Sequence, residues 1–160
     1  MIRDINVYDS KQICDIYNYY VLKTIVTFEE SEVTEADMRS RIENTNAKIP
    51  WIVYEVDGII LGYAYASEWK PRCAYKNSLE TTVYLRNCES GKGVGSLLYA
   101  ELVHRLKAMN YHALIGGISL PNKASIALHE KFGFEKIGQF KEVGYKFDHW
   151  IDVGYWELIL

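Results

Sequence analysis

Val83-Tyr84-Leu85, followed by the run Gly91-Lys92-Gly93-Val94-Gly95-Ser96, is the stretch that decides the fold class of this chain. The first part has the β-branched and aromatic residues of a strand, and the second precedes Leu98, Leu102 and Leu106, which recur at helical spacing. A strand, a glycine turn and a helix together form a phosphate-binding geometry, because the first N–H groups of the helix point at an anion. A tight turn that only starts a helix, with no ligand, is the alternative.

The spacing of the glycines excludes two well-known nucleotide loops. A P-loop needs G-x-x-x-x-G-K-[ST], but Lys92 is followed by Gly93. A dinucleotide fingerprint needs a third glycine where Ser96 stands, and it needs an acid at the end of the next strand, which the run Ala113 to Leu120 lacks. A G-x-G-x-G turn remains, and it suits an anion held by backbone amides.

Strands and helices alternate on both sides of this turn, which predicts an α/β domain with a mixed sheet. Asp57-Gly58 predicts a tight hairpin, and Asp9 with Gln12 resembles a capping box. The predicted strands are Ile2 to Asn6, Trp51 to Val56, Ile59 to Ser67, Ser78 to Leu85, Ala113 to Leu120, about Phe134 to Phe147 and Val153 to Leu160. The predicted helices are Ser10 to Thr24, one opened by Thr34, one opened by the glycine turn, and one from Asn122 to Phe132.

Composition narrows the class of protein. A chain of 160 residues with 49% hydrophobic residues predicts one soluble globular domain, residues 1–160. A net charge of -3 argues against a nucleic-acid-binding surface. The three cysteines and four histidines have no spacing typical of a metal site, and no apolar stretch is long enough to cross a membrane. Without a signal peptide at its start, the chain is expected to be cytoplasmic.

The chain resembles the GNAT superfamily of acetyl-CoA-dependent N-acetyltransferases in the strand and glycine turn quoted above, in Asn122-Lys123-Ala124-Ser125 and in Leu128-His129-Glu130-Lys131-Phe132-Gly133-Phe134. Further segments are similar to phosphinothricin acetyltransferase and its amino-acid N-acetyltransferase relatives: Thr27-Phe28-Glu29-Glu30, Gly62-Tyr63-Ala64-Tyr65-Ala66, Trp69-Lys70-Pro71-Arg72-Cys73-Ala74-Tyr75, Glu80-Thr81-Thr82-Val83-Tyr84 and Gly144-Tyr145-Lys146-Phe147. The resemblance implies the GNAT fold, with a mixed, mostly antiparallel central sheet flanked by helices, and a homodimer. Trp150 and Trp156 in the final strands are expected at the dimer interface.

The resemblance also implies where acetyl-CoA binds. The strand Val83-Tyr84-Leu85 would pair with the pantetheine arm, and the amides of Gly91, Lys92, Gly93, Val94, Gly95 and Ser96 would hold the pyrophosphate. Asn122 and Ser125 match positions near the pantetheine. Ser90 stands where the family often has Arg or Gln, so one side-chain contact with the pyrophosphate is lost. No metal is implied.

The same resemblance assigns catalytic and substrate residues. Glu80 matches the general base, since an amine must lose its proton before it attacks a thioester. His129 either protonates the leaving thiolate or packs against the sheet. Arg72, with Lys70 beside it, suits a substrate carboxylate. Residues expected at the substrate pocket are Phe28, Tyr75, Thr82, Tyr84 and Val153.

These expectations favour an enzyme that transfers acetyl from acetyl-CoA directly to the α-amine of a small amino acid or analogue, such as phosphinothricin, methionine sulfoximine or methionine sulfone. Two alternatives stay open. One is acetylation of a protein N-terminus or lysine, and the other is a CoA-binding domain without turnover.

Overall fold

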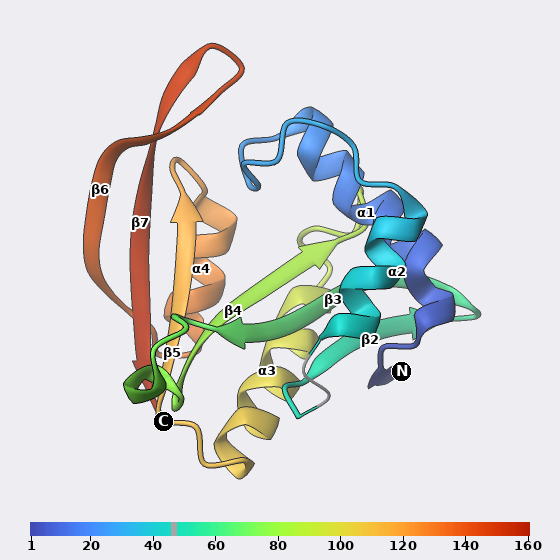
Figure 1. The fold of residues 1–160 in the computed structure, drawn as a ribbon, viewed down its shortest axis with the longest axis horizontal. Coiled ribbons are helices and arrows are strands. Elements are labelled where there is room, and N and C mark those ends of the chain that lie inside the picture. Colours follow the sequence, from blue (N-terminus) through green and yellow to red (C-terminus); the bar gives the residue numbers. More distant parts are fainter. Residues whose placement is uncertain (46–47) are drawn as a thin grey trace.

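A seven-stranded sheet runs through the molecule in the order β1-β2-β3-β4-β5-β7-β6 (Figure 1). The computed structural model describes residues 1–45 and 48–160. The strands are β1 Ile2–Asp4, β2 Trp51–Val56, β3 Ile59–Glu68, β4 Ser78–Leu85, β5 Ala113–Ser119, β6 Glu135–Lys146 and β7 His149–Ile159. The α-helices are α1 Ser10–Lys23, α2 Glu35–Asn44, α3 Val94–Ala108 and α4 Lys123–Lys131, and the short 3-10 turns are η1 Val7–Asp9 and η2 Cys73–Tyr75. Since β4 and β5 pair in parallel and the other neighbours are antiparallel, the predicted mixed, mostly antiparallel sheet is confirmed.

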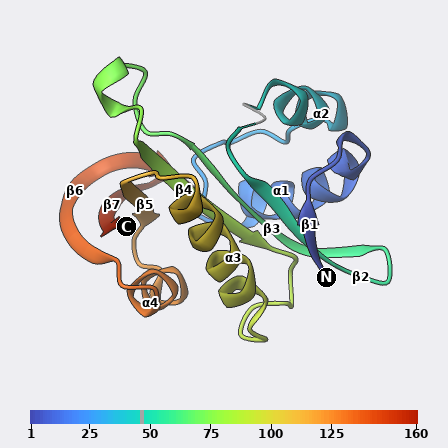
Figure 2. The ribbon, with the colours of Figure 1, turned by 90° about the horizontal axis from the view of Figure 1, so that it is seen from below.

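Helices cover the two faces of the sheet and divide the core into two layers (Figure 2). The apolar stripe of α3, formed by Leu98, Leu102 and Leu106, is fully buried with residues of β2 to β5 in one cluster. Ile13 of α1 and Met38 of α2 belong to the second cluster, on the other face. The helical spacing seen in the sequence therefore corresponds to buried stripes.

The capping box predicted at Asp9 and Gln12 is wrong. The capping box lies one turn earlier, where Asn6 caps η1 and its backbone N–H donates to Asp9. Asp9 makes no side-chain cap on α1, because its carboxylate accepts two hydrogen bonds from Arg3 at 2.7 and 2.8 Å. Gln12 instead accepts from the backbone N–H of Ile60 and donates to Gly58, which joins α1 to the β2–β3 hairpin.

The last two strands form a longer hairpin than the sequence predicted. β7 begins at His149 rather than near Val153, because Phe147 and Asp148 make a two-residue turn with φ of 51° and 59°. Two positive φ values are typical of the type I′ turn, which usually contains glycine or asparagine. Trp150 is 64% exposed on this hairpin, but Trp156 is 2% exposed in the core. The expectation of Trp156 at an interface is therefore wrong.

The sheet opens in the middle. β4 and β5 are paired only from Ser78 with Ala113 to Glu80 with Ile115, and beyond this point the two strands diverge (Figure 1). The opening exposes one edge of β4 and one edge of β5 between the glycine turn, α4 and the α1–α2 connection. The candidate site lies there.

Candidate active site

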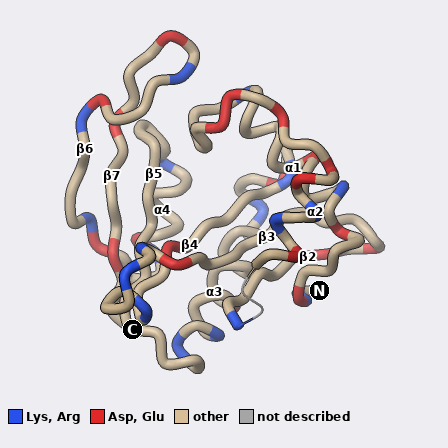
Figure 3. The backbone as a smooth tube through the Cα atoms, viewed as in Figure 1, with Lys and Arg blue, Asp and Glu red and all other residues tan. Residues whose placement is uncertain are grey.

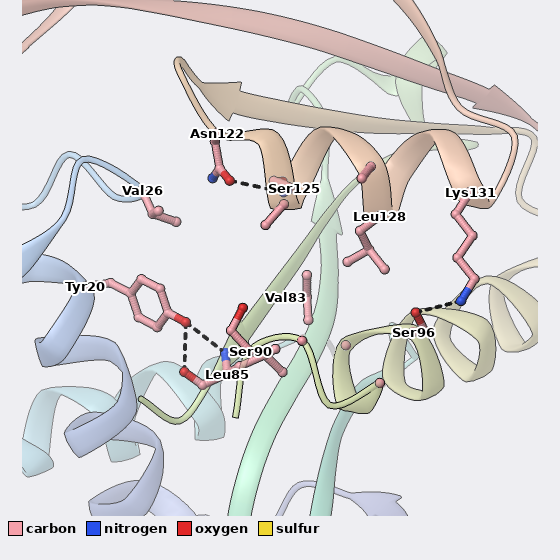
Figure 4. A pocket seen from close by; sticks show the side chains of 15 residues that line it. Tyr20, Val26, Val83, Leu85, Ser90, Ser96, Asn122, Ser125, Leu128 and Lys131 are labelled. Atoms are coloured by element: carbon pink, nitrogen blue, oxygen red, sulfur yellow. Dashed lines mark hydrogen bonds between the residues drawn. The ribbon is translucent and has the colours of Figure 1, made fainter. Parts of the chain in front are cut away.

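The open edge of β4 offers unpaired backbone groups to a ligand. Arg86 donates its backbone N–H to the carbonyl of Leu61 in β3, so the backbone of Arg86 faces β3. Backbone groups of successive strand residues point to alternate edges. The N–H and C=O groups of Val83 and Leu85 therefore point to the other edge of β4, away from β3. The Tyr20 hydroxyl donates to the Leu85 carbonyl at 2.8 Å and accepts from the Leu85 N–H at 3.2 Å (Figure 4). Val83 is thus the residue of this edge whose backbone can pair with an extended ligand as an added strand would.

The glycine turn ends at the first turn of α3 and leaves its N–H groups free. Gly91 and Gly93 have φ of 80° and 88°, a left-handed conformation that favours glycine. Gly93 is the N-cap residue, and no side chain caps the helix. The N–H groups at the start of α3 have no acceptor within the helix, so they form an anion site with the positive end of the helix dipole.

A cavity of about 660 Å³ joins the open edge of β4 to this turn (Figure 4). We call it the glycine-loop cavity. It is lined by Tyr20, Val26, Val83, Leu85, Ser90, Gly91, Gly93, Gly95, Ser96, Asn122, Ala124, Ser125, Ala127, Leu128 and Lys131. The structure thereby brings together eight of the expected acetyl-CoA residues: Val83, Leu85, Gly91, Gly93, Gly95, Ser96, Asn122 and Ser125. The backbone edge of β4 and the N–H groups at the start of α3 suit an elongated ligand with an anionic group at one end.

The start of α4 forms the opposite wall of the glycine-loop cavity. Asn122 is the N-cap of α4, and its side-chain oxygen accepts from the Ser125 N–H at 3.0 Å. This leaves the amide N–H₂ of Asn122 as a donor toward the cavity. The capping bond fixes the orientation of that donor, so one residue both starts the helix and presents a polar group to a ligand.

A lysine that the sequence did not single out lies at the anion site. Lys131, at the end of α4, donates to the Ser96 hydroxyl at 2.9 Å and lines the glycine-loop cavity (Figure 4). Lys92, whose amide was expected at the pyrophosphate, forms a side-chain ion pair with Glu89 at 3.1 Å and does not line this cavity. The positive charge beside the first turn of α3 therefore comes from α4, which no local sequence pattern indicates.

If this anion site holds the pyrophosphate of acetyl-CoA, as the resemblance implies, Lys131→Ala is expected to raise the KM for acetyl-CoA roughly three- to tenfold and to leave kcat unchanged, because one cation near a phosphate group is lost. The effect should shrink at high salt, since the lysine is exposed. Steady-state kinetics at two ionic strengths measure it. Lys92→Ala is the matched control, with a KM within about twofold of the parent. A larger effect in the control would place the phosphates at Lys92 instead.

A second hollow meets the first one at Val26. It has a volume of about 360 Å³ and is called the Glu80 hollow below. Its lining residues are Val26, Phe28, Glu80, Gly117, Ser119, Val143, Val153 and Tyr155. Three expected residues, Glu80, Phe28 and Val153, are thus brought together. Because Val26 lines both spaces, a group bound in the Glu80 hollow lies next to the end of a ligand that enters between β4 and β5.

Glu80 is a carboxylate in an apolar setting. Within residues 1–45 and 48–160 it has no hydrogen-bond or ion-pair partner, and burial raises its pKa above the usual value of a carboxyl group. Its Oε1 atom lies 3.2 Å from the position that a Cβ on Gly117 would take, and the Tyr155 ring lies 3.3 Å from the same point. The glycine therefore makes room for both side chains. An unpaired carboxylate with a raised pKa can accept a proton from an ammonium group.

The connection between α1 and α2 forms one wall of the Glu80 hollow and contacts β6. Lys146 is 2% exposed and donates to the Thr27 carbonyl at 2.8 Å. Phe28 packs directly on Gly144, since a Cβ there would meet the Phe28 ring at 2.4 Å. Acidic residues are concentrated along this connection (Figure 3), and Glu30 favours the charged form of Lys146 while burial lowers its pKa. These contacts fix Val26 and Phe28 beside the cleft.

The other expected substrate residues do not all lie in the Glu80 hollow: some line a neighbouring space, one is exposed and one is in the core. Lys70 and Tyr75 line a third space next to the Glu80 hollow, with Tyr155 as a shared wall. Arg72 is exposed at the start of η2 and lines none of these three spaces. Thr82 shares a β4 face with Glu80 and lies half-buried beside Tyr65. Tyr84 is 7% exposed in the core cluster beneath α1, where its ring lies 5.3 Å from Tyr17.

His129 lies behind the cavity wall. It is 4% exposed, its Nδ1 lies 2.7 Å from the Ser125 carbonyl oxygen, and its ring packs edge-on against Tyr99 and Phe134. Its Nε2 has no hydrogen-bond partner among residues 1–45 and 48–160 and faces Gly116, where a Cβ would come within 2.3 Å. Burial lowers its pKa, so the neutral ring is favoured. This setting matches the packing role that the sequence left open.

Tyr20, Val26, Leu128 and Lys131 line the glycine-loop cavity without having been singled out in the sequence. These residues belong to three separate segments, and only the packing of α1 and α4 beside β4 brings them together.

Comparison with known proteins agrees with this geometry. The chain matches the acetyltransferase (GNAT) domain family over residues 2–154 and belongs to that family. It is 39% identical to a phosphinothricin N-acetyltransferase of Streptomyces coelicolor, over 93% of this chain and 90% of the relative. It is 35% identical to an L-methionine sulfoximine/L-methionine sulfone acetyltransferase of Pseudomonas aeruginosa, over 99% and 94%.

A solved structure is equally similar. The GNAT superfamily phosphinothricin acetyltransferase of Sinorhizobium meliloti in complex with AcCoA superposes with a TM-score of 0.96 at 35% identity, covering 100% of this chain and 88% of that one. The protein is therefore an N-acetyltransferase with acetyl-CoA as its co-substrate. The glycine-loop cavity has free backbone N–H groups and a lysine, which are suitable donors for an anionic ligand. In the part of the chain that the structure describes, no helix is long and apolar enough to span a membrane, and no cluster of metal-binding side chains is found.

Proposed function

We propose that the enzyme acetylates the α-amine of a small amino acid or amino-acid analogue by direct transfer in a ternary complex. The observation that carries this proposal is the junction at Val26, where the glycine-loop cavity meets a small hollow that contains Glu80. The names of the relatives, which act on phosphinothricin and methionine sulfoximine, support the same substrate class.

Glu80 is the proposed base. An α-ammonium group titrates at about pH 8 or above, so at neutral pH most of the substrate must lose a proton before it can attack. The Glu80 carboxylate attracts the ammonium ion and accepts its proton, directly or through a water molecule. The amine nitrogen forms a bond to the acetyl carbon of acetyl-CoA while the C–S bond breaks. The nitrogen then loses its second proton to water, and CoA leaves as a thiolate that takes up a proton from water. The free edge of β4 at Val83 provides an N–H donor for the carbonyl oxygen.

Lys70 is the proposed partner of the substrate carboxylate. It is the one cation that lines either the Glu80 hollow or the space next to it in the described chain. Its Nζ lies 5.4 Å from the Trp69 ring centroid and 6.0 Å from that of Tyr75, and these rings hold the ammonium at the rim. Arg72 is a second donor for the carboxylate if its loop closes over the bound substrate.

His129 and Ser125 are proposed to act as one unit at the cavity wall. Ser125 lines the glycine-loop cavity, and its hydroxyl lies 3.4 Å from the His129 Nδ1. We assign His129 a positioning role through this contact rather than a direct transfer of a proton to the thiolate, because burial keeps the ring away from the three described spaces.

A thiol-release assay with acetyl-CoA and a panel of amines tests the proposal. Methionine sulfone, phosphinothricin and L-methionine are expected to release CoA thiol, whereas a tripeptide with a free N-terminus and N-acetyl-lysine methylamide are not. Faster turnover of the peptide would replace the proposal with protein acetylation. If none of the amines causes thiol release although CoA binds tightly, the protein is a CoA-binding domain without turnover.

We also propose that the enzyme is a cytoplasmic homodimer. Tyr145, Phe147 and Trp150 are half or more exposed at the end of the β6–β7 hairpin, and the tilted rings of Tyr145 and Trp150 have centroids 4.8 Å apart. A second copy is the proposed cover for this apolar surface. The three free cysteines are compatible with a reducing compartment. Sedimentation of Trp150→Lys beside the parent protein tests the dimer, since the charged variant should sediment as a monomer.

A further inference from the structure

A third space continues the Glu80 hollow along the same face of the sheet. Ile115, Gly117 and Ser119 of β5 alternate along one face, and β7 places Glu157, Tyr155 and Val153 directly opposite them. The Glu80 hollow takes in the Gly117 and Ser119 end, and the third space, of about 700 Å³, takes in the Ile115 end. Tyr155 borders both, so the two form one trough whose halves lie roughly 7 Å apart along the strands.

Most of the side chains that line the third space are aromatic or aliphatic, with Lys70, Ser78, Gln139 and Glu157 as its polar members, and we call it the aromatic hollow. It is lined by Trp69, Lys70, Tyr75, Ser78, Ile115, Ile137, Gly138, Gln139, Phe140, Tyr155 and Glu157. Trp69 and Phe140 each meet the Tyr155 ring edge-on, both with centroids 5.7 Å apart. Such rings favour an apolar or aromatic group placed between them.

The position of Glu80 fixes which part of a substrate would enter the aromatic hollow. Glu80 pairs with Ile115 across β4 and β5, at the boundary between the two halves of the trough. If the substrate amine lies at Glu80 and receives the acetyl group from the Val26 side, the carboxylate and side chain of the substrate lie on the Ile115 side. The carboxylate can reach Lys70 at the rim, and the side chain then lies between Trp69, Phe140 and Tyr155.

We infer that the aromatic hollow is a side-chain subsite and that the enzyme prefers amino acids with a large apolar or aromatic side chain. The inference rests on the proposed function, because it assumes that an amino acid binds with its amine at Glu80. It goes beyond that function by naming the residues that select the side chain.

Gly138 offers a way to fill this subsite without disturbing the core. It pairs with Tyr155 across β6 and β7, so its missing side chain would project on the same face as the Tyr155 ring. A Cβ at Gly138 meets nothing within 4 Å. A larger side chain at this position therefore enters the aromatic hollow and competes with the substrate.

The test compares kcat/KM for L-phenylalanine and L-alanine in the parent, Gly138→Phe and Gly138→Ala. The parent is expected to favour phenylalanine by at least about tenfold, as the fit of one large apolar group allows. Gly138→Phe should lower the phenylalanine-to-alanine ratio at least tenfold, and Gly138→Ala, which adds one methyl group, should change it less than twofold. If Gly138→Phe does not fold, Trp69→Ala in the exposed loop before η2 should lower the same ratio.

The outcomes separate the two proposals. A parent enzyme that acetylates alanine as well as phenylalanine overturns the subsite and leaves amino-acid acetylation in place. A phenylalanine-to-alanine ratio that folded Gly138→Phe leaves unchanged overturns it as well. Absence of turnover with every amino acid and sulfone, in a parent enzyme that still binds CoA, overturns the proposed function itself.

Discussion

Glu80→Gln is expected to lower kcat about 10²- to 10⁴-fold, the range that a positioned general base contributes. The affinity for acetyl-CoA should not change, because Glu80 lines the Glu80 hollow and not the glycine-loop cavity. Steady-state kinetics together with calorimetric titration of CoA separate the two quantities. Equal turnover in the parent and the variant would remove Glu80 from the mechanism.

The pH profile gives a second measurement on the same residue. Burial raises the pKa of Glu80, so the carboxylate is protonated over a wider range of acidic pH than an exposed glutamate. A base must be ionised to accept a proton, and kcat/KM of the parent should therefore rise with pH through this raised pKa. Glu80→Gln should lack that rise.

Loss of stability cannot explain a loss of turnover in this variant. A carboxyl group whose folded pKa is raised binds its proton more tightly in the folded state, so stability falls as pH rises from the unfolded pKa through the folded one. Neutral glutamine removes this penalty, and Glu80→Gln should unfold at the same or a higher temperature at pH 7. Glu68→Gln, an exposed glutamate at the end of β3, is the matched control, with kcat within about twofold of the parent.

Gly95→Asp is expected to raise the KM for acetyl-CoA at least about 100-fold. Gly95 lies in the first turn of α3 and lines the glycine-loop cavity. An added carboxylate would accept hydrogen bonds from the free N–H groups at the start of α3 and would thereby compete with a phosphate for them. It would also repel the phosphate charge. Asp at a helix N-terminus is favourable for the helix, so the variant should remain folded. Calorimetric titration with CoA measures the corresponding loss of binding affinity.

Gly95→Ala is the control for size. A Cβ at Gly95 would lie 3.5 Å from Leu85 and 3.8 Å from Leu128, which is ordinary contact, so the methyl group fits. Alanine is the better helix former by roughly 1 kcal/mol. This variant should therefore be slightly more stable than the parent and bind CoA within a few-fold. Normal CoA binding by Gly95→Asp would show that the pyrophosphate does not lie at the start of α3.

Local sequence patterns predicted most elements because their causes are local. Asp57-Gly58 forms the expected hairpin with φ of 51° and 78°, and Thr34 caps α2 as expected. The Phe147-Asp148 turn was missed because Phe147 is not a usual type I′ residue and the turn contains no glycine, and the hairpin is held by the long pairing of β6 with β7. The capping role of Asp9 was misassigned because Arg3, in β1, donates two hydrogen bonds to its carboxylate.

The sequence by itself determined the strand, glycine turn and helix that make an anion site, since glycine conformation and free helical N–H groups are properties of one continuous segment. Only the tertiary structure decided which cation stands there, because Lys131 reaches Ser96 from α4 while Lys92 pairs with its neighbour Glu89. It also decided that His129 lies behind the cavity wall and that Glu80 faces Tyr155. Those outcomes depend on the divergence of β4 and β5 and on the position of α4 beside β5, which are relations between separate segments of the chain.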